Sequence, residues 1–166
     1  IRHLDYQSES TILNIERSSA VFGNHTGHSN EDALKNFSDV SLQIFSEIKD
    51  FASPVAGAKD FIEWAASRYR LVLATNPIWP ESVTRLRLQW TGIAADRFEF
   101  VTHAENSHFT KPDPRYYQYL LDRFGVTPQT CLMIGDSFSK DGPAAQVGIP
   151  VVILSPSGEN LKLVRP

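Results

Sequence analysis

Two carboxylates flank one short loop in the second half of this sequence. Residues 131–134 form an unbroken apolar run that ends at Gly135, and Asp136 follows directly. Asp141 comes five residues later, before a short Ala-rich turn that stops at Gly148 and a second apolar run at 150–154. Short apolar runs of this kind predict buried strands, and ligands of parallel sheets bind beyond the carboxyl ends of the strands. We therefore expect polar chemistry in the loop that carries Asp136 and Asp141.

Two further polar groups, a hydroxyl and an ammonium, lie at the end of a predicted strand and in a predicted loop. Thr75 and Asn76 close the apolar run 71–74, and Lys111 lies in the loop at 110–114. A Lys and a Thr suit the oxygens of an anion, whereas carboxylate oxygens suit a hard cation such as Mg²⁺. Together with the two carboxylates, these residues predict a phosphate site beside a divalent cation.

The elements that would position these residues alternate along the chain after Pro54. Helices are predicted at 58–67, 81–90 and 114–124, the last capped by Asp113 and stopped by Gly125. Strands are predicted at 71–75, 98–102, 131–134 and 150–154. Helices that separate short apolar strands imply right-handed crossovers, so we predict an α/β, Rossmann-like, three-layer α/β/α fold with a parallel sheet.

The region before Pro54 has a different pattern. Residues 1–30 read as irregular, and the polar stretch 23–29 is predicted to be a loop. Ser29 or Asn30 can cap a helix that runs to about Phe51, with apolar residues on one face. We therefore divide the chain into residues 1–53 and a core of residues 54–166.

The composition and the distribution of charge argue against nucleic acid and membranes as partners. The 166 residues are 42% hydrophobic and 21% charged, with a net charge of −3 and no basic run, which argues against binding to nucleic acid. No apolar run has the length needed to cross a membrane. The single cysteine, Cys131, falls in a predicted core strand, so we expect a reducing compartment and a cytoplasmic protein.

Three of these segments resemble motifs of the haloacid dehalogenase-like (HAD) hydrolases. The segment 71–76 is similar to the second motif of that family, a strand that ends in Ser or Thr. Lys111-Pro112 is similar to the third motif, and Gly135-Asp136 with Asp141 to the fourth, an acidic pair after a strand. The resemblance covers about residues 54–154 and implies that residues 1–53 are the remnant of a helical cap with a linker.

The first motif of the family, Asp-x-Asp-x-Thr, has no match in this sequence. The early candidate is Asp5, but Gln7 stands where the second aspartate belongs. We expect that the chain begins after this motif, with the first core strand missing, or that it is a relative without a nucleophile. Residues 11–16 or a second copy of the chain could fill the place of that strand, which makes a homo-oligomer a candidate.

The resemblance implies a Mg²⁺-dependent phosphatase of a small phosphorylated metabolite, acting through an aspartyl phosphate. In that scheme Asp136 binds Mg²⁺, Asp141 holds a metal-bound water or orients Lys111, and Lys111 pairs with the phosphoryl group. Thr75 and the backbone of Asn76 bind phosphoryl oxygens. The Gly-Asp form of the fourth motif favours a phosphatase over a dehalogenase, which usually has Ser-Ser-Asn there. Without the nucleophile, we expect this chain to be inactive; the alternative is a non-catalytic interaction or structural protein.

Overall fold

The computed structural model describes residues 11–154 and 161–164, which fall into two compact units. The boundary between the units lies between His108 and Phe109. Asp5 and Gln7 lie outside the described residues. The predicted boundary between cap and core at residues 53 and 54 stays a prediction.

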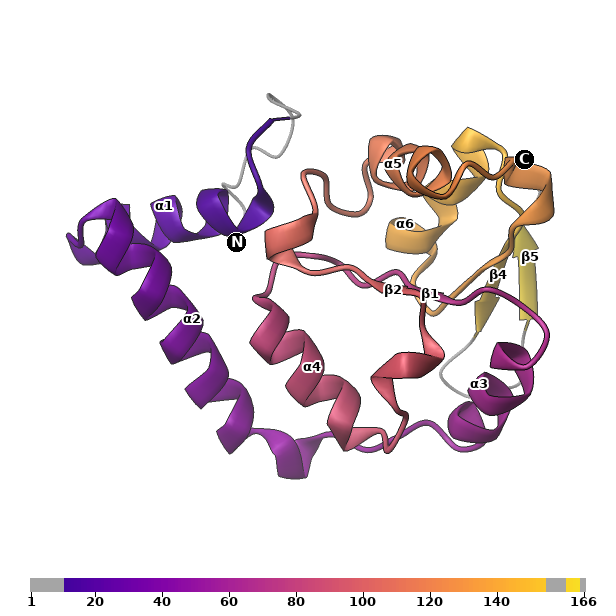
Figure 1. Ribbon diagram of the computed structural model, residues 1–166, viewed down its shortest axis with the longest axis horizontal. Helices are drawn as coiled ribbons and strands as arrows, with labels where there is room; N and C mark the ends of the chain where they lie inside the picture. The colour runs from indigo at the N-terminus through magenta and orange to yellow at the C-terminus, as the bar shows by residue number, and fades with distance from the viewer. Residues whose placement is uncertain (1–10, 155–160, 165–166) are drawn as a thin grey trace. The chain divides into compact units, whose positions relative to one another are not determined.

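The first unit combines helices with one pair of short parallel strands (Figure 1). In β1 (Val72–Leu73) and β2 (Phe100–Val101), Val72 pairs with Phe100 and Leu73 with Val101. Its remaining elements are α1 (Asn14–Thr26), α2 (Asn30–Glu47), η1 (Lys49–Phe51), α3 (Ala58–Ala66), α4 (Glu81–Trp90), η2 (Ala95–Arg97) and η3 (Ala104–Asn106). The predictions of α3 and α4 are confirmed, whereas α2 ends at Glu47 and not near Phe51, with η1 in between. Ser29 caps α2 by accepting a hydrogen bond from the backbone N–H of Asp32.

Helix α1 corrects two expectations from the sequence. The predicted loop at 23–29 is wrong for residues 23–26, which belong to α1. Two polar side chains there bond to carbonyls of the preceding turn: His25 Nδ1 lies 2.8 Å from the Val21 carbonyl, and the Thr26 hydroxyl donates to the Phe22 carbonyl. Gly23 is required by packing, since a Cβ there would lie 2.9 Å from the Cβ of Ala33 on α2. Residues 11–16 form a turn and the start of α1, so they are not a strand.

Aromatic side chains hold α2 against the loop that follows β1. The ring of Trp79 stacks on Phe37 at a centroid distance of 6.3 Å and meets Phe45 edge-on at 5.0 Å. Phe45 also lies 6.4 Å from the ring of Trp90 on α4. Such rings bury a large apolar area, so this cluster fixes α2 relative to α4 and to the loop after β1.

The second unit is built around a three-stranded sheet in the order β3, β4, β5. Strands β3 (Met133–Gly135) and β4 (Val151–Leu154) are parallel, as predicted, whereas β5 (Leu161–Val164) is antiparallel to β4 and was not predicted. Its remaining elements are α5 (Pro114–Phe124), η4 (Pro128–Thr130), α6 (Phe138–Asp141) and η5 (Gly142–Val147). The caps predicted for α5 are confirmed: Asp113 accepts a hydrogen bond from the N–H of Arg115, and Gly125 ends the helix with a φ of 58°.

The prediction that β3 is buried on both faces is wrong. Leu132 is 56% exposed and Ile134 38% exposed, and Cys131 is half-buried just before the strand. Within the described residues β3 is an edge strand, because its one pairing partner there is β4. The centre of the sheet is β4, where Val151 is fully buried.

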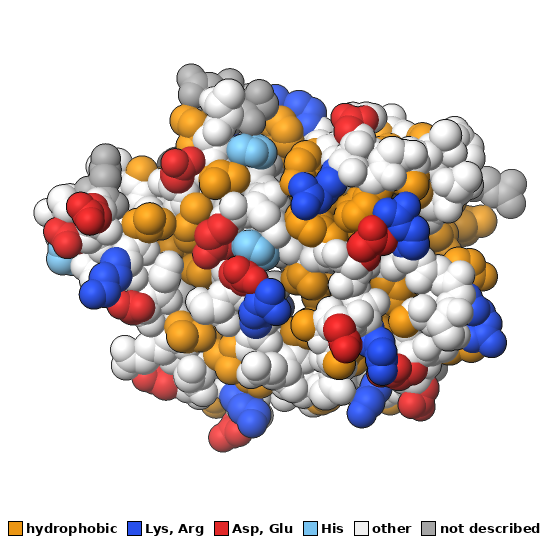
Figure 2. Space-filling model, viewed as in Figure 1, with side chains coloured by type: hydrophobic (Ala, Val, Ile, Leu, Met, Phe, Trp, Pro, Cys, Tyr) orange, Lys and Arg blue, Asp and Glu red, His pale blue; other side chains and the backbone are white. Residues whose placement is uncertain are grey.

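Charges on the face shown in Figure 2 are mixed, with acidic and basic side chains interspersed, as the small net charge suggests. None of the described helices has the length and apolar character that a membrane span requires.

Candidate active site

Lys111 and Asp141 form a buried ion pair in the second unit. The Lys111 ammonium donates a hydrogen bond of 2.6 Å to Asp141 Oδ1, and the two residues are 9% and 4% exposed. Lys111 lies in the loop before α5, and its Nζ is 5.9 Å from the centroid of the Tyr116 ring. A buried lysine that keeps a carboxylate partner can stay charged where an isolated one would not.

Gly135 is what allows Asp141 to take this position. A Cβ at residue 135 would lie 2.1 Å from Asp141 Oδ2, much closer than two such atoms can approach. The same Oδ2 accepts a hydrogen bond of 3.0 Å from the backbone N–H of Ser137. Both carboxylate oxygens of Asp141 therefore have protein donors, and the side chain lies against the end of β3.

Burial and charge act in opposite directions on Lys111. Burial lowers the pKa of the Lys111 ammonium below its ordinary value, while the hydrogen bond to Asp141 and the charges of Asp141 and Asp136 act to raise it. Burial also raises the pKa of the Tyr117 hydroxyl, aided by the charge of Asp141. That hydroxyl donates to the Lys140 carbonyl at 2.5 Å, which ties α5 to α6.

Asp136 is placed differently from Asp141. Its charge reaches Lys111 electrostatically, but none of the described side chains donates a hydrogen bond to it. Within residues 11–154 and 161–164, no group of three or more His, Cys, Asp or Glu side chains is arranged to hold a metal ion. Mg²⁺ usually keeps several waters and is held by one or two carboxylates, so the predicted binding of Mg²⁺ by Asp136 and Asp141 stays a prediction.

Thr75 and Asn76 belong to the first unit, where they follow β1. The Thr75 hydroxyl donates to the Thr102 carbonyl at 2.6 Å, and the Thr75 N–H donates to Thr102 Oγ1 at 2.8 Å. Thr102 is completely buried directly after β2, and Thr75 is partly exposed. The Asn76 carbonyl accepts a hydrogen bond from the N–H of Ile78, which turns the chain away from the strand.

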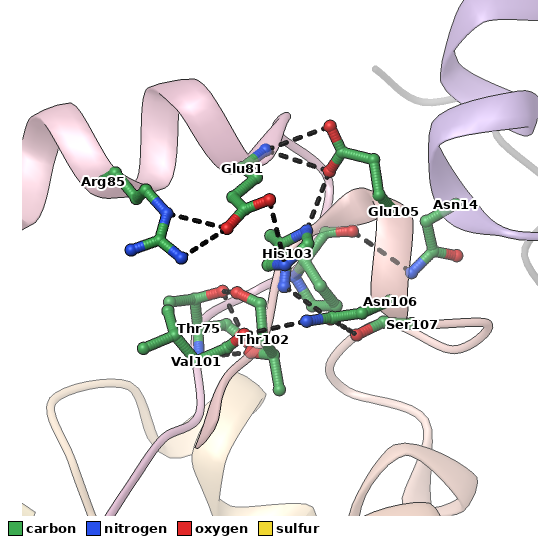
Figure 3. A network of polar contacts seen from close by, with 11 residues as sticks. Asn14, Thr75, Glu81, Arg85, Val101, Thr102, His103, Glu105, Asn106 and Ser107 are labelled. Carbon is green, nitrogen blue, oxygen red and sulfur yellow. Dashed lines mark hydrogen bonds and ion pairs between the residues drawn. The ribbon is translucent and has the colours of Figure 1, made fainter. Parts of the chain in front are cut away.

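A polar network orders the loops that follow β1 and β2 (Figure 3). The Glu105 carboxylate accepts from the N–H of Glu81, the first residue of α4, at 2.9 and 3.1 Å, and lies 2.9 Å from Nδ1 of His103. Asn106 accepts from the His103 N–H and donates to the Val101 carbonyl, both at 2.9 Å. The network thus anchors the end of β2 to the N-terminus of α4.

Asn14 joins α1 to the same loops. Its side-chain amide donates to the Pro77 carbonyl at 3.1 Å, and its N–H donates to the Ser107 carbonyl at 2.9 Å. The first turn of α1 is therefore bound to the segments that follow both strands of the first unit. Beside the network, a cavity of about 270 Å³ lies between α4 and β2.

Each of the two units contains one part of the predicted site. Lys111 and Asp141 are in contact and Asp136 acts on them through its charge; Thr75 and Asn76 lie together in the first unit. Convergence of the two groups on one phosphate stays a prediction. Sequence reasoning missed Thr102; a polar residue at the end of the strand that pairs with β1 was the available signal.

Thr75 follows β1 and Asp136 follows β3, and ligands of parallel α/β sheets bind beyond the carboxyl ends of such strands. This chain is a member of the haloacid dehalogenase-like hydrolases, because that family's model matches residues 9–148. The match begins after Asp5.

Three phosphatases are similar in sequence. The chain is 37% identical over 91 residues to a phosphoglycolate phosphatase of Rhodospirillum rubrum, which covers 55% of this chain and 36% of that protein. It is 30% identical over 123 residues to a phosphorylated carbohydrates phosphatase of Thermotoga maritima, covering 72% of this chain and 55% of that protein. A phosphoglycolate phosphatase of Nitrosococcus oceani is 28% identical over 138 residues, covering 82% and 60%. The matches thus span between about a third and three fifths of these relatives.

Solved structures share the fold. A HAD phosphatase from Thermococcus onnurineus superposes with a TM-score of 0.60 at 21% identity, over 88% of this chain and 79% of the other. A 2-haloacid dehalogenase from Pseudomonas syringae gives 0.61 at 23% identity, over 88% and 61%. At these identities the likeness concerns the fold, which phosphatases and dehalogenases have in common.

Proposed function

We propose that this chain carries the lysine, threonine and acidic motifs of a Mg²⁺-dependent phosphatase that acts on a small phosphorylated metabolite. The observation that carries the proposal is the buried ion pair between Lys111 and Asp141, with Gly135 beneath it. A lysine held in this way presents a fixed positive charge at the end of a strand, which is where a phosphoryl group needs it. The names of the three sequence relatives favour phosphoglycolate or a sugar phosphate as first substrates to test.

Each residue has a defined part in this proposal. Lys111 neutralises charge on the phosphoryl oxygens, and Asp141 positions Lys111, since both of its oxygens already accept hydrogen bonds. Thr75 and the backbone of Asn76 bind the remaining phosphoryl oxygens. Asp136 would supply one carboxylate ligand to Mg²⁺, an ion that shields charge between nucleophile and phosphate when bound.

The covalent step needs a nucleophile, and residues 1–166 contain no match to the motif that supplies it in this family. The family resemblance implies an aspartyl phosphate, but the sequence contains no Asp-x-Asp pair. We therefore expect residues 1–166 on their own to show no hydrolysis of p-nitrophenyl phosphate with Mg²⁺. Turnover that disappears in Asp136→Asn would contradict this account of the nucleophile.

Binding tests the phosphate site without requiring turnover. Inorganic phosphate titrated into the chain, followed by NMR, is expected to shift the signals of Lys111 and of its loop. Lys140→Met is the matched control, because Lys140 is an exposed lysine of the same unit and this variant should bind phosphate normally. Lys111→Met should lose binding while its amide spectrum stays dispersed. Equal binding by both variants would argue against the proposed role of Lys111.

A non-catalytic protein is the second candidate, favoured by the lack of an Asp-x-Asp pair in the sequence. The source DNA upstream of the Ile1 codon separates the two candidates. An in-frame Asp-x-Asp-x-Thr motif there supports the phosphatase, whereas its absence supports the non-catalytic protein.

A further inference from the structure

The cavity between α4 and β2 has no part in the proposed function. Its volume is about 270 Å³, and a cavity of about 150 Å³ is large enough to hold benzene. Part of its wall is apolar and includes Leu88, Phe98 and Val101, whereas Glu81 and His103 belong to its polar part. The cavity therefore has room for one ring or a short aliphatic chain that carries a polar group.

The hydrogen bonds of His103 determine what its ring offers to a ligand. Nδ1 lies 2.9 Å from Glu105 Oε2, and a carboxylate has only lone pairs, so in the neutral ring Nδ1 carries the hydrogen and Nε2 is an acceptor. Within residues 11–154 and 161–164, no group donates to Nε2. Its polar neighbour there is Glu81 Oε2 at 3.9 Å, which is also an acceptor (Figure 3).

The charges around these two acceptors favour a cation. Arg85 lies 2.6 Å from Glu81 Oε1 and balances the charge of Glu81, but among the described residues Oε2 of the same carboxylate receives no hydrogen bond. Glu105 has the ring of His103 as its ion-pair partner within the described residues, and a neutral ring leaves its negative charge uncompensated. A ligand with N–H donors and a positive charge therefore complements this part of the cavity.

We propose that this cavity binds a small primary amine in its protonated form, with the ammonium between Glu81 Oε2 and His103 Nε2. An ammonium has three hydrogens and no lone pair, so it can donate to both acceptors at once. The acceptors are 3.9 Å apart, which one nitrogen at about 2.9 Å from each can span. The apolar body of the amine then packs against Leu88 and Phe98. No residue of the proposed phosphate site lines this cavity, so the inference does not rest on the proposed function.

The test is a titration of the full chain with benzylamine, followed by nitrogen NMR of labelled histidine at a pH of about 8, where an ordinary imidazole is neutral. Before benzylamine is added, the hydrogen of the His103 ring should be on Nδ1, and a hydrogen on Nε2 would overturn the proposal. Bound benzylamine should shift the Nε2 signal. Benzyl alcohol has the same ring without the charge and should bind about five- to tenfold more weakly, because it forms neutral hydrogen bonds.

Two variants locate the ammonium. Glu81→Gln should weaken benzylamine binding about five- to tenfold through loss of the charged acceptor. Glu99→Gln is the matched control and should bind benzylamine within about twofold of the original, because Glu99 lines the same cavity but accepts two hydrogen bonds of 2.7 Å from Arg70.

The outcomes that contradict the proposal are distinct. Unchanged affinity in Glu81→Gln would exclude the ammonium from that position, and equal weakening by both variants would mean that negative charge in general attracts the amine. Should Glu81→Gln not fold, the unmodified chain decides: a stationary Nε2 signal of His103 in the presence of benzylamine, or equal binding of benzyl alcohol, would refute the site.

Discussion

Replacement of Gly135 by alanine isolates the steric condition on which the Lys111–Asp141 pair depends. The new Cβ would lie 2.1 Å from Asp141 Oδ2 and 2.7 Å from Asp141 Cβ, so the Asp141 side chain must move. Gly135 is not among the glycines with positive φ, which means that alanine can adopt its backbone conformation without strain. The clash with Asp141 is therefore the dominant effect of the substitution.

The magnitude follows from the pair that would be disrupted. Removing one partner of a buried ion pair costs about 3–5 kcal/mol. Because Gly135→Ala displaces Asp141 without removing it, we expect a loss at the lower end, about 3 kcal/mol of unfolding free energy. For a chain of this length, that corresponds to a fall in melting temperature of roughly 6–12 °C. Urea unfolding and calorimetry measure both quantities. The loss should be accompanied by weaker binding of inorganic phosphate, because Lys111 loses its orienting partner.

Gly142→Ala is the matched control. Gly142 has helical dihedral angles, and its Cβ would meet Phe138 at an ordinary contact distance of 3.7 Å. This variant should have unchanged stability or gain up to about 1 kcal/mol, because alanine restricts the unfolded chain. If Gly135→Ala were as stable as Gly142→Ala, the placement of Asp141 against Gly135 would be refuted.

Three other substitutions test the packing and the polar contacts. Lys111→Met should cost about 3–5 kcal/mol of unfolding free energy, because it leaves the Asp141 carboxylate buried without its cation. In urea unfolding, the double variant with Asp141→Asn should recover part of that loss. Glu105→Ala should cost about 1 kcal/mol by removing the acceptor at the first N–H of α4, while Glu105→Gln retains most of the stability; equal losses would exclude this capping role. Gly23→Ala should cost about 1–3 kcal/mol through contact with Ala33 on α2, a loss that thermal unfolding would register and that Ala33→Gly should partly offset.

Local signals in the sequence were sufficient for most of the helices. The predicted start of α4 after Pro80 and the ends of α5 at Asp113 and Gly125 agree with the structure. A proline at a helix start, an aspartate that caps the first N–H groups and a glycine with positive φ act on their own few residues. Such effects depend little on the remainder of the fold.

Helix α1 and strand β3 show where local signals fail. The polar residues at the end of α1 resemble a loop, yet packing of that helix against α2 accompanies a helix that continues to Thr26. The exposure of Ile134 depends on which strands pair with β3, and an apolar sequence cannot reveal that. In both cases the result depends on contacts between segments that are distant in the sequence, and the periodicity of a single segment cannot reveal such contacts.

The candidate site divides in the same way between sequence and tertiary structure. The sequence by itself determined that Thr75, Lys111, Asp136 and Asp141 follow strands or precede helices, and so which residue types could meet a phosphate. Only the tertiary structure decided that the two Asp141 oxygens accept hydrogen bonds from the Lys111 ammonium and the Ser137 N–H. It also decided that the Thr75 hydroxyl donates to the Thr102 carbonyl. The reason is physical: Lys111 and Asp141 are 30 residues apart, and Thr75 and Thr102 are 27 apart, so their hydrogen bonds exist only once strands and helices have packed.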